Sequence, residues 1–218
     1  DNGIAVAMIL AILTDDSLAH PPIEALITAD EEIGMLGAFA LDCSQLKGHK
    51  LINLDSEYEG ILMCSCAGGV NVRSTVPVAR EAVTGAAVDI VIKALTSGHS
   101  GVEIDKGRAN ANALMGRMLC ELAAKEDFRL AALEGGSRET AIAASSSAQI
   151  IDEPGKATGV CEIVRKLGAQ YASEYATAEP NMQVNAVAGK TGTVEVLTQA
   201  GTEKVWQVLV SLPDSVQA

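Results

Sequence analysis

The chain has 218 residues, 48% of them hydrophobic and 20% charged, which excludes an intrinsically disordered protein. The formal net charge of −12 argues against binding to nucleic acid or to an anionic membrane surface, because both are themselves negative. Aromatic residues make up only 3%, so the core must be built from aliphatic side chains. The five cysteines are an odd set without disulfide-framework or zinc-finger spacing, which favours a reducing, cytoplasmic location.

The first third of the chain alternates between helical and extended patterns. Residues 4–13 are apolar on every side, which predicts a buried helix too short to cross a bilayer. An apolar strand is expected over residues 23–28, a short helix over 35–41 and a second strand over 51–54. This order predicts an α/β unit with a mainly parallel sheet over residues 1–68.

The remaining residues, 69–218, have the pattern of a separate α+β domain. Their alternating and apolar runs predict an antiparallel sheet with two helices on one face. The expected strands are residues 70–77, 88–95, 128–133, 145–151, 191–197 and 205–212, and the expected helices are 107–125 and 158–175. The last two strands are expected to form a closing hairpin through the turn at residues 199–202.

Acidic residues follow both expected strands of the first unit. Asp30, Glu31 and Glu32 come directly after the first strand, and Asp55 closes the second. In open α/β sheets, ligands gather beyond the carboxyl ends of the strands, where several carboxylates repel one another unless a cation neutralises them. The pattern therefore favours a metal site over its alternative, a solvated acidic loop.

The adjacent Glu31 and Glu32 point in different directions in either a strand or a helix. One carboxylate can then bind a metal while the other takes a proton from a metal-bound water. The pair predicts a hydrolytic site with a general base.

Five short motifs in register resemble a known family. They are Asp1-Asn2-Gly3-Ile4, Thr28-Ala29-Asp30-Glu31-Glu32-Ile33-Gly34-Met35, Asn53-Leu54-Asp55-Ser56-Glu57, Ala67-Gly68-Gly69 and Gly98-His99-Ser100-Gly101. Their order is similar to that in the cocatalytic-zinc dipeptidases, specifically the aminoacyl-histidine (Xaa-His) dipeptidase branch, peptidase D. The resemblance covers nearly the whole chain and weakens after residue 152.

This resemblance implies two zinc ions, with cobalt or manganese as alternatives. Asp1 would bridge the ions, Glu32 would bind one and Asp55 the other, while Glu31 would be the general base. The second domain would be a lid that forms a homodimer. Its His99 would contact the substrate and stabilise the tetrahedral oxyanion. The expected substrates are dipeptides of the Xaa-His or β-alanyl-His type.

Arg108 and Asn110 lie in a segment that also matches this branch, residues 106–112. The resemblance implies that they bind substrate. Asparagine is also a preferred residue at the start of a helix, and capping is the alternative for Asn110.

The chain also departs from the family pattern. The His-x-Asp motif expected before Asp1 and the histidine ligand expected after the lid are absent, and Val210 to Leu212 occupy a strand where relatives would carry a basic side chain. Three carboxylates cannot fill two zinc coordination shells, so we expect a catalytically incomplete chain that hydrolyses little or nothing. Two other hypotheses stay open: a non-catalytic dimerisation module, or an aminoacylase-like or carboxypeptidase-like hydrolase of the same superfamily.

Overall fold

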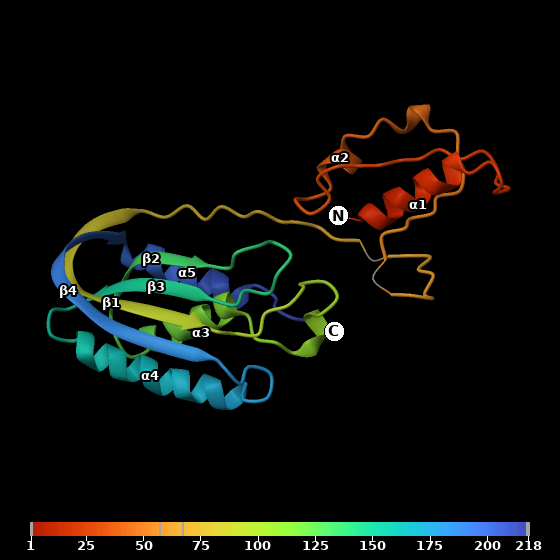
Figure 1. Cartoon of the computed structure of the whole chain (residues 1–218). Coiled ribbons are helices and arrows are strands. Elements are labelled where there is room, and N and C mark those ends of the chain that lie inside the picture. Colours follow the sequence, from red (N-terminus) through yellow and green to blue (C-terminus); the bar gives the residue numbers. More distant parts are fainter. Residues whose placement is uncertain (1, 57, 67, 217–218) are drawn as a thin grey trace. The chain divides into compact units, whose positions relative to one another are not determined.

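The computed structural model describes residues 2–56, 58–66 and 68–216, and the chain divides into two compact units. The first unit is Asp1–Asn71 and the second is Val72–Ala218. The sequence-based boundary lay at residue 68. Figure 1 shows the elements of each unit.

The first unit begins with helix α1 (Gly3–Thr14), which confirms the helix predicted there. Asn2 caps it, because its side chain accepts a hydrogen bond from the Ala5 amide at 3.2 Å. The prediction that this helix is buried was wrong for the described unit, since Ala5 is its one buried residue and Ile4 is 71% exposed. An apolar helix is buried only where other elements pack around it, and the other described segments of this unit leave most of its surface open.

The described residues of the first unit contain no β-strand. Besides α1 they form helix α2 (Leu36–Phe39) and a 3₁₀ turn (Cys43–Gln45). The strands predicted at residues 23–28 and 51–54 were therefore wrong, and the parallel α/β sheet is not confirmed. A strand exists only through pairing with a neighbour, and these apolar segments stay largely exposed instead, with Leu51 84% accessible.

The second unit is built on a four-stranded antiparallel sheet, as the sequence predicted (Figure 1). Its strands are β1 (Arg80–Lys93), β2 (Arg129–Gly135), β3 (Ser146–Asp152) and β4 (Gln183–Leu197), in the order β2-β3-β1-β4. The separate strand predicted over residues 70–77 was wrong. Residues 70–77 belong to none of the described strands, and the strand that follows, β1, covers residues 88–93 of the second predicted strand.

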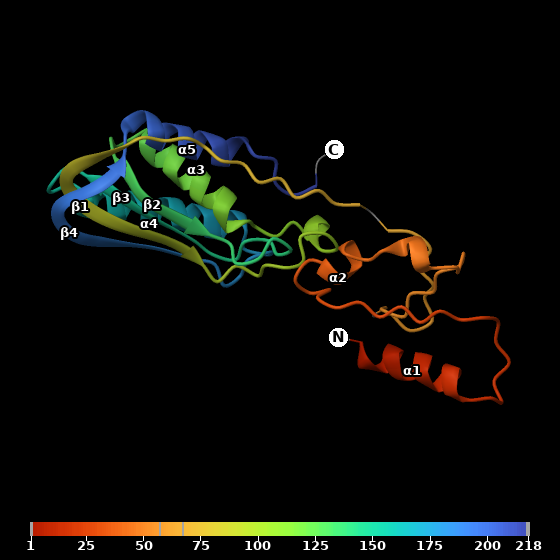
Figure 2. The same cartoon turned by 90° about the horizontal axis from the view of Figure 1, so that it is seen from above.

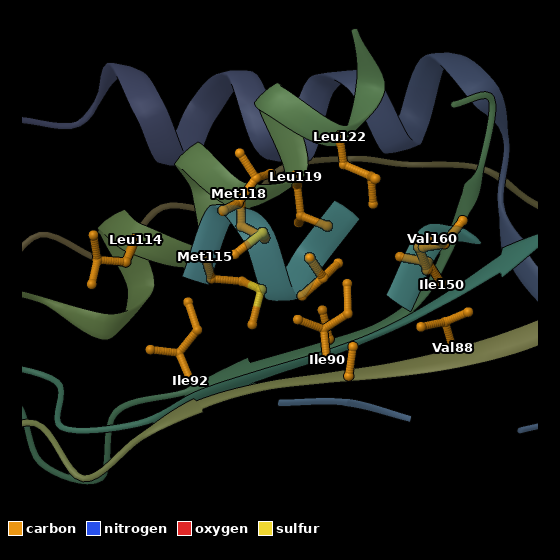
Figure 3. Packing of buried hydrophobic residues seen from close by; sticks show 14 of the residues in the cluster. Val88, Ile90, Ile92, Leu114, Met115, Met118, Leu119, Leu122, Ile150 and Val160 are labelled. Atoms are coloured by element: carbon orange, nitrogen blue, oxygen red, sulfur yellow. The ribbon is translucent and has the colours of Figure 1, made fainter. Parts of the chain in front are cut away.

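Helices α3 (Ala111–Ala123) and α4 (Ala157–Glu174) pack on one face of this sheet (Figure 2). Ile90 of β1 points toward Leu119 of α3, and Ile150 of β3 lies beside Val160 of α4 (Figure 3). All four side chains are at most 1% exposed. The opposite face carries only a small apolar cluster centred on Ala131, Ile151 and Val196. The α+β prediction for this unit is thus confirmed.

A third helix, α5 (Gln199–Ser211), replaces the hairpin strand predicted at residues 205–212. The predicted turn is the first turn of this helix, because the Thr198 side chain accepts from the Gly201 amide at 3.2 Å. Val205 and Trp206 pack against the core on the same side of the helix as the buried Thr202, a spacing that only a helix provides.

Helix α5 lies against α3, where Gly116 permits a close approach (Figure 3). A Cβ atom at Gly116 would lie 2.6 Å from the Cβ of Leu209, which is closer than real Cβ contacts allow. The missing side chain at this position therefore sets the spacing between the two helices.

A buried acid, Asp152, lies at the end of β3. Asp152 is 3% exposed, its Oδ1 accepts from the Glu153 amide at 2.5 Å, and its Oδ2 has no hydrogen-bond partner within the described residues. Burial raises the pKa of Asp152 above the ordinary aspartate value.

An Asp152→Asn variant is therefore expected to lose less stability than the wild type as pH rises. A raised folded-state pKa contributes stability below the unfolded value of about 3.9, and this contribution disappears as pH rises through the folded pKa. Melting temperatures between about pH 4 and 7 measure the difference. Parallel pH profiles of the two proteins would contradict it.

Candidate functional site

The predicted lid residues lie in one connection, residues 94–110 between β1 and α3, which we call the His99 loop. This loop lies along the segment that precedes β3. The Ser97 hydroxyl donates to the Ile142 carbonyl at 2.6 Å, and the Ser100 amide donates to the Thr140 carbonyl at 2.8 Å. These bonds give the loop a defined path even though it contains no regular strand.

Glu103 is the centre of the loop. Its carboxylate accepts from Lys106 Nζ at 2.7 Å, from the His99 amide at 2.8 Å and from the Arg108 guanidinium at 3.0 Å. The Lys106 bond above all, together with the His99 amide and Arg108, lowers the pKa of Glu103 to about 2. Glu103 is therefore ionised at neutral pH and holds three parts of the loop together.

A Glu103→Gln variant is expected to lose less stability than the wild type on acidification. A lowered folded-state pKa contributes stability above the unfolded value of about 4.3, and this is lost as pH falls toward the folded value of about 2. Thermal unfolding across that range measures it. Glu162→Gln, on the exposed side of α4, is the control, and equal acid sensitivity of wild type and Glu103→Gln would contradict the role of Glu103.

Arg108 faces into the loop and contacts it through two nitrogens. Besides its bond to Glu103, it donates to the Ser97 carbonyl. Gly98 makes room for it, because Gly98 has φ +145° and a Cβ there would collide with the guanidinium. The substrate-binding role implied for Arg108 stays a prediction, and the bonds present shape the loop.

Asn110 stands at the start of α3. Its side chain accepts from the Asn112 amide at 2.9 Å and donates to Asp214 Oδ1 at 3.1 Å. These contacts match the capping alternative. Its proposed contact with substrate stays a prediction.

His99 lies exposed at the tip of the loop. Its Nδ1 atom accepts from the Gly101 amide at 3.0 Å and from the Val102 amide at 3.3 Å. These bonds fix the ring orientation relative to the loop backbone.

Glu179, in the connection between α4 and β4, was missed by sequence reasoning. It is 2% exposed, and its carboxylate accepts from the Thr96 amide at 2.5 Å and from the Ala109 amide at 2.9 Å. A single glutamate before a proline in a turn carries no signal that separates it from a solvated acid.

The predicted metal ligands belong to the first unit. Asp1 lies outside the described residues, and Asp30, Glu31 and Glu32 lie exposed in a turn. Asn2 contacts the second acidic segment, donating from Nδ2 to the Leu54 carbonyl at 2.9 Å and to Asp55 Oδ1 at 3.4 Å. Among the described residues no three His, Cys, Asp or Glu side chains are grouped to hold a metal ion, and the metal-binding role of Glu32 and Asp55 stays a prediction.

Comparison with known proteins first identifies the class of the second unit. A family model described as the peptidase dimerisation domain matches residues 90–157, from β1 through the His99 loop to the start of α4. This part of the second unit is thus similar to a peptidase dimerisation domain. None of the helices formed by residues 2–56, 58–66 and 68–216 has the length and apolar character needed to span a membrane.

Two relatives then identify the family. Over 184 residues the chain is 39% identical to the cytosol non-specific dipeptidase of Escherichia coli K12, covering 84% of this chain and 38% of the relative. The crystal structure of aminoacylhistidine dipeptidase from Vibrio alginolyticus is 32% identical, with a TM-score of 0.74, over 100% of this chain and 45% of that one. The chain belongs to the peptide hydrolase family of these two dipeptidases. It spans less than half the length of either relative.

Proposed function

We propose that this chain is part of a metal-dependent dipeptidase in which the His99 loop contacts the substrate. The observation that carries the proposal is the ordered loop itself, which lies inside the matched dimerisation domain and presents an exposed histidine. The expected substrates are dipeptides of the Xaa-His or β-alanyl-His type. The names of the two relatives support a dipeptidase over an aminoacylase-like or carboxypeptidase-like activity.

The catalytic roles proposed for the first unit rest on the order of the motifs and on the contact between Asn2 and Asp55. Glu31 is the general base that takes a proton from the attacking water. Asp1, Glu32 and Asp55 would hold two zinc ions, with cobalt or manganese as alternatives. Bound zinc lowers the pKa of water toward neutrality.

The three proposed carboxylate ligands, Asp1, Glu32 and Asp55, are too few to fill the coordination shells of two zinc ions. We therefore propose that the 218-residue chain alone hydrolyses little or nothing. The specific alternative is a non-catalytic dimerisation module, which the well-packed second unit and the exposed first unit favour.

The proposed partners are a small peptide substrate and a second copy of the chain, bound through the second unit. The dimerisation-domain match supports the homodimer. The name of the cytosolic relative supports a cytoplasmic location, and the net charge of −12 argues against nucleic acid and membrane partners.

Activity can be tested in a chimera in which the matching segments of the Escherichia coli dipeptidase complete this chain at both ends. His99→Ala is expected to lower kcat/KM for a dipeptide by about 10²–10³-fold, because it removes a donor to the developing oxyanion. His49→Ala, an exposed histidine in the first unit with no proposed role, is the control. Equal activities of the two variants would refute the role of His99.

A further inference from the structure

A single buried carboxylate closes the base of the His99 loop. Glu179 joins Thr96, at the start of the loop, to Ala109, at its end, through one backbone amide of each. Neither a lysine nor an arginine forms an ion pair with Glu179 in the described part of the chain. Burying a carboxylate costs free energy unless hydrogen bonds satisfy it, and here the amides of Thr96 and Ala109 do so. The buried Glu179 therefore joins the two ends of the His99 loop.

The contacts continue from this base to the tip of the loop. Joining Thr96 to Ala109 brings their chain neighbours Ser97 and Arg108 together, and the Arg108 guanidinium donates to the Ser97 carbonyl. The same guanidinium binds Glu103, whose other oxygen accepts from the His99 amide. Hydrogen bonds, together with the covalent links from Thr96 to Ser97 and from Arg108 to Ala109, therefore connect the buried carboxylate to the backbone of His99.

The loop geometry also selects one tautomer of the neutral His99 ring. Its Nδ1 accepts hydrogen bonds from two amides, those of Gly101 and Val102. A nitrogen that accepts in a neutral imidazole carries no proton, so the proton of neutral His99 resides on Nε2. Nε2 is then the donor available to an oxygen outside the loop.

We propose that Glu179 is a positioning residue that holds the loop in the shape in which His99 exists as the Nε2–H tautomer. In this form His99 donates from Nε2 to the carbonyl oxygen of a bound peptide. The identity of that acceptor rests on the proposed function, whereas the link between Glu179 and the tautomer does not.

The test uses the 218-residue chain labelled with ¹⁵N, with Glu179→Gln as the variant. Glutamine keeps the shape of glutamate but can accept only one of the two amide bonds and places an NH₂ group against the other amide. We expect amide exchange at Thr96 or Ala109 to rise about tenfold, and the His99 ring to change from one tautomer to a mixture. Glu162→Gln on the exposed side of α4 is the matched control and is expected to change neither signal.

A single Nε2–H tautomer in Glu179→Gln would overturn the proposal, whether or not the two amides exchange faster, because Glu179 would then be only structural. If Glu179→Gln does not fold, Glu179→Asp decides the question by the same two signals, since its shorter side chain reaches at most one amide. Neither signal depends on peptide hydrolysis, so failure of the dipeptidase proposal would leave this result unaffected.

Discussion

Replacing Ile90 by alanine is expected to lower the free energy of unfolding of the second unit by about 3 kcal/mol. Ile90 lies in β1, between Ala148 of β3 and Ala186 of β4, and is 0% exposed. The small alanines beside it cannot fill the cavity that its side chain would leave, and a fixed cavity adds to the lost burial. Denaturant unfolding followed through Trp206, the one tryptophan of the sequence, measures the change.

Val187→Ala is the matched control, because Val187 lies in neighbouring strand β4 but is 62% exposed. Its effect is expected to stay within about 0.5 kcal/mol. Similar losses in the two variants would mean that the face of the sheet toward α3 and α4 is not the core.

Gly116→Ala is expected to destabilise the second unit by about 1–3 kcal/mol and to loosen α5 from α3. The new methyl group would lie 2.6 Å from Leu209 Cβ and 3.3 Å from the Leu209 carbonyl carbon, so the helices must separate. Thermal unfolding gives the stability, and the fluorescence of Trp206 on α5 reports the helix itself.

The control for this variant is a second helical glycine. Gly159 in α4 has nothing within 4 Å of a Cβ placed on it, so Gly159→Ala is expected to be neutral or stabilising, by up to about 1 kcal/mol. Stabilisation by both substitutions would contradict the close packing of α5 on α3.

Hydrophobic pattern was sufficient to predict most of the second unit. Helices α3 and α4 and strands β2 and β3 lie close to their predicted ranges, because each buries one apolar face in the same core. Helix α5 was mistaken for a strand because its apolar residues fit either period over a short run. Two features favour the helix: the cap by Thr198 and the contact of Leu209 with Gly116. The contact could not be predicted from the sequence, because it exists only once α3 and α5 are packed together.

The first unit shows the opposite limit. Apolar runs at residues 23–28 and 51–54 have strand composition, yet composition does not supply the neighbouring strands that a parallel sheet requires.

The candidate site could likewise be predicted only in part from the sequence. His99 could be found from its motif, whereas Glu179 could not, because its role depends on two amides that lie more than 60 residues away in sequence.

The most direct measurement is β-alanyl-histidine turnover by the chimera completed at both ends, with zinc and after its removal by a chelator. We predict zinc-dependent turnover that falls about 10²–10⁴-fold in Glu31→Gln and is unchanged in Glu59→Gln, an exposed glutamate of the same unit. Turnover that survives Glu31→Gln, or cleavage of acylated amino acids with no cleavage of dipeptides, would contradict the proposed function.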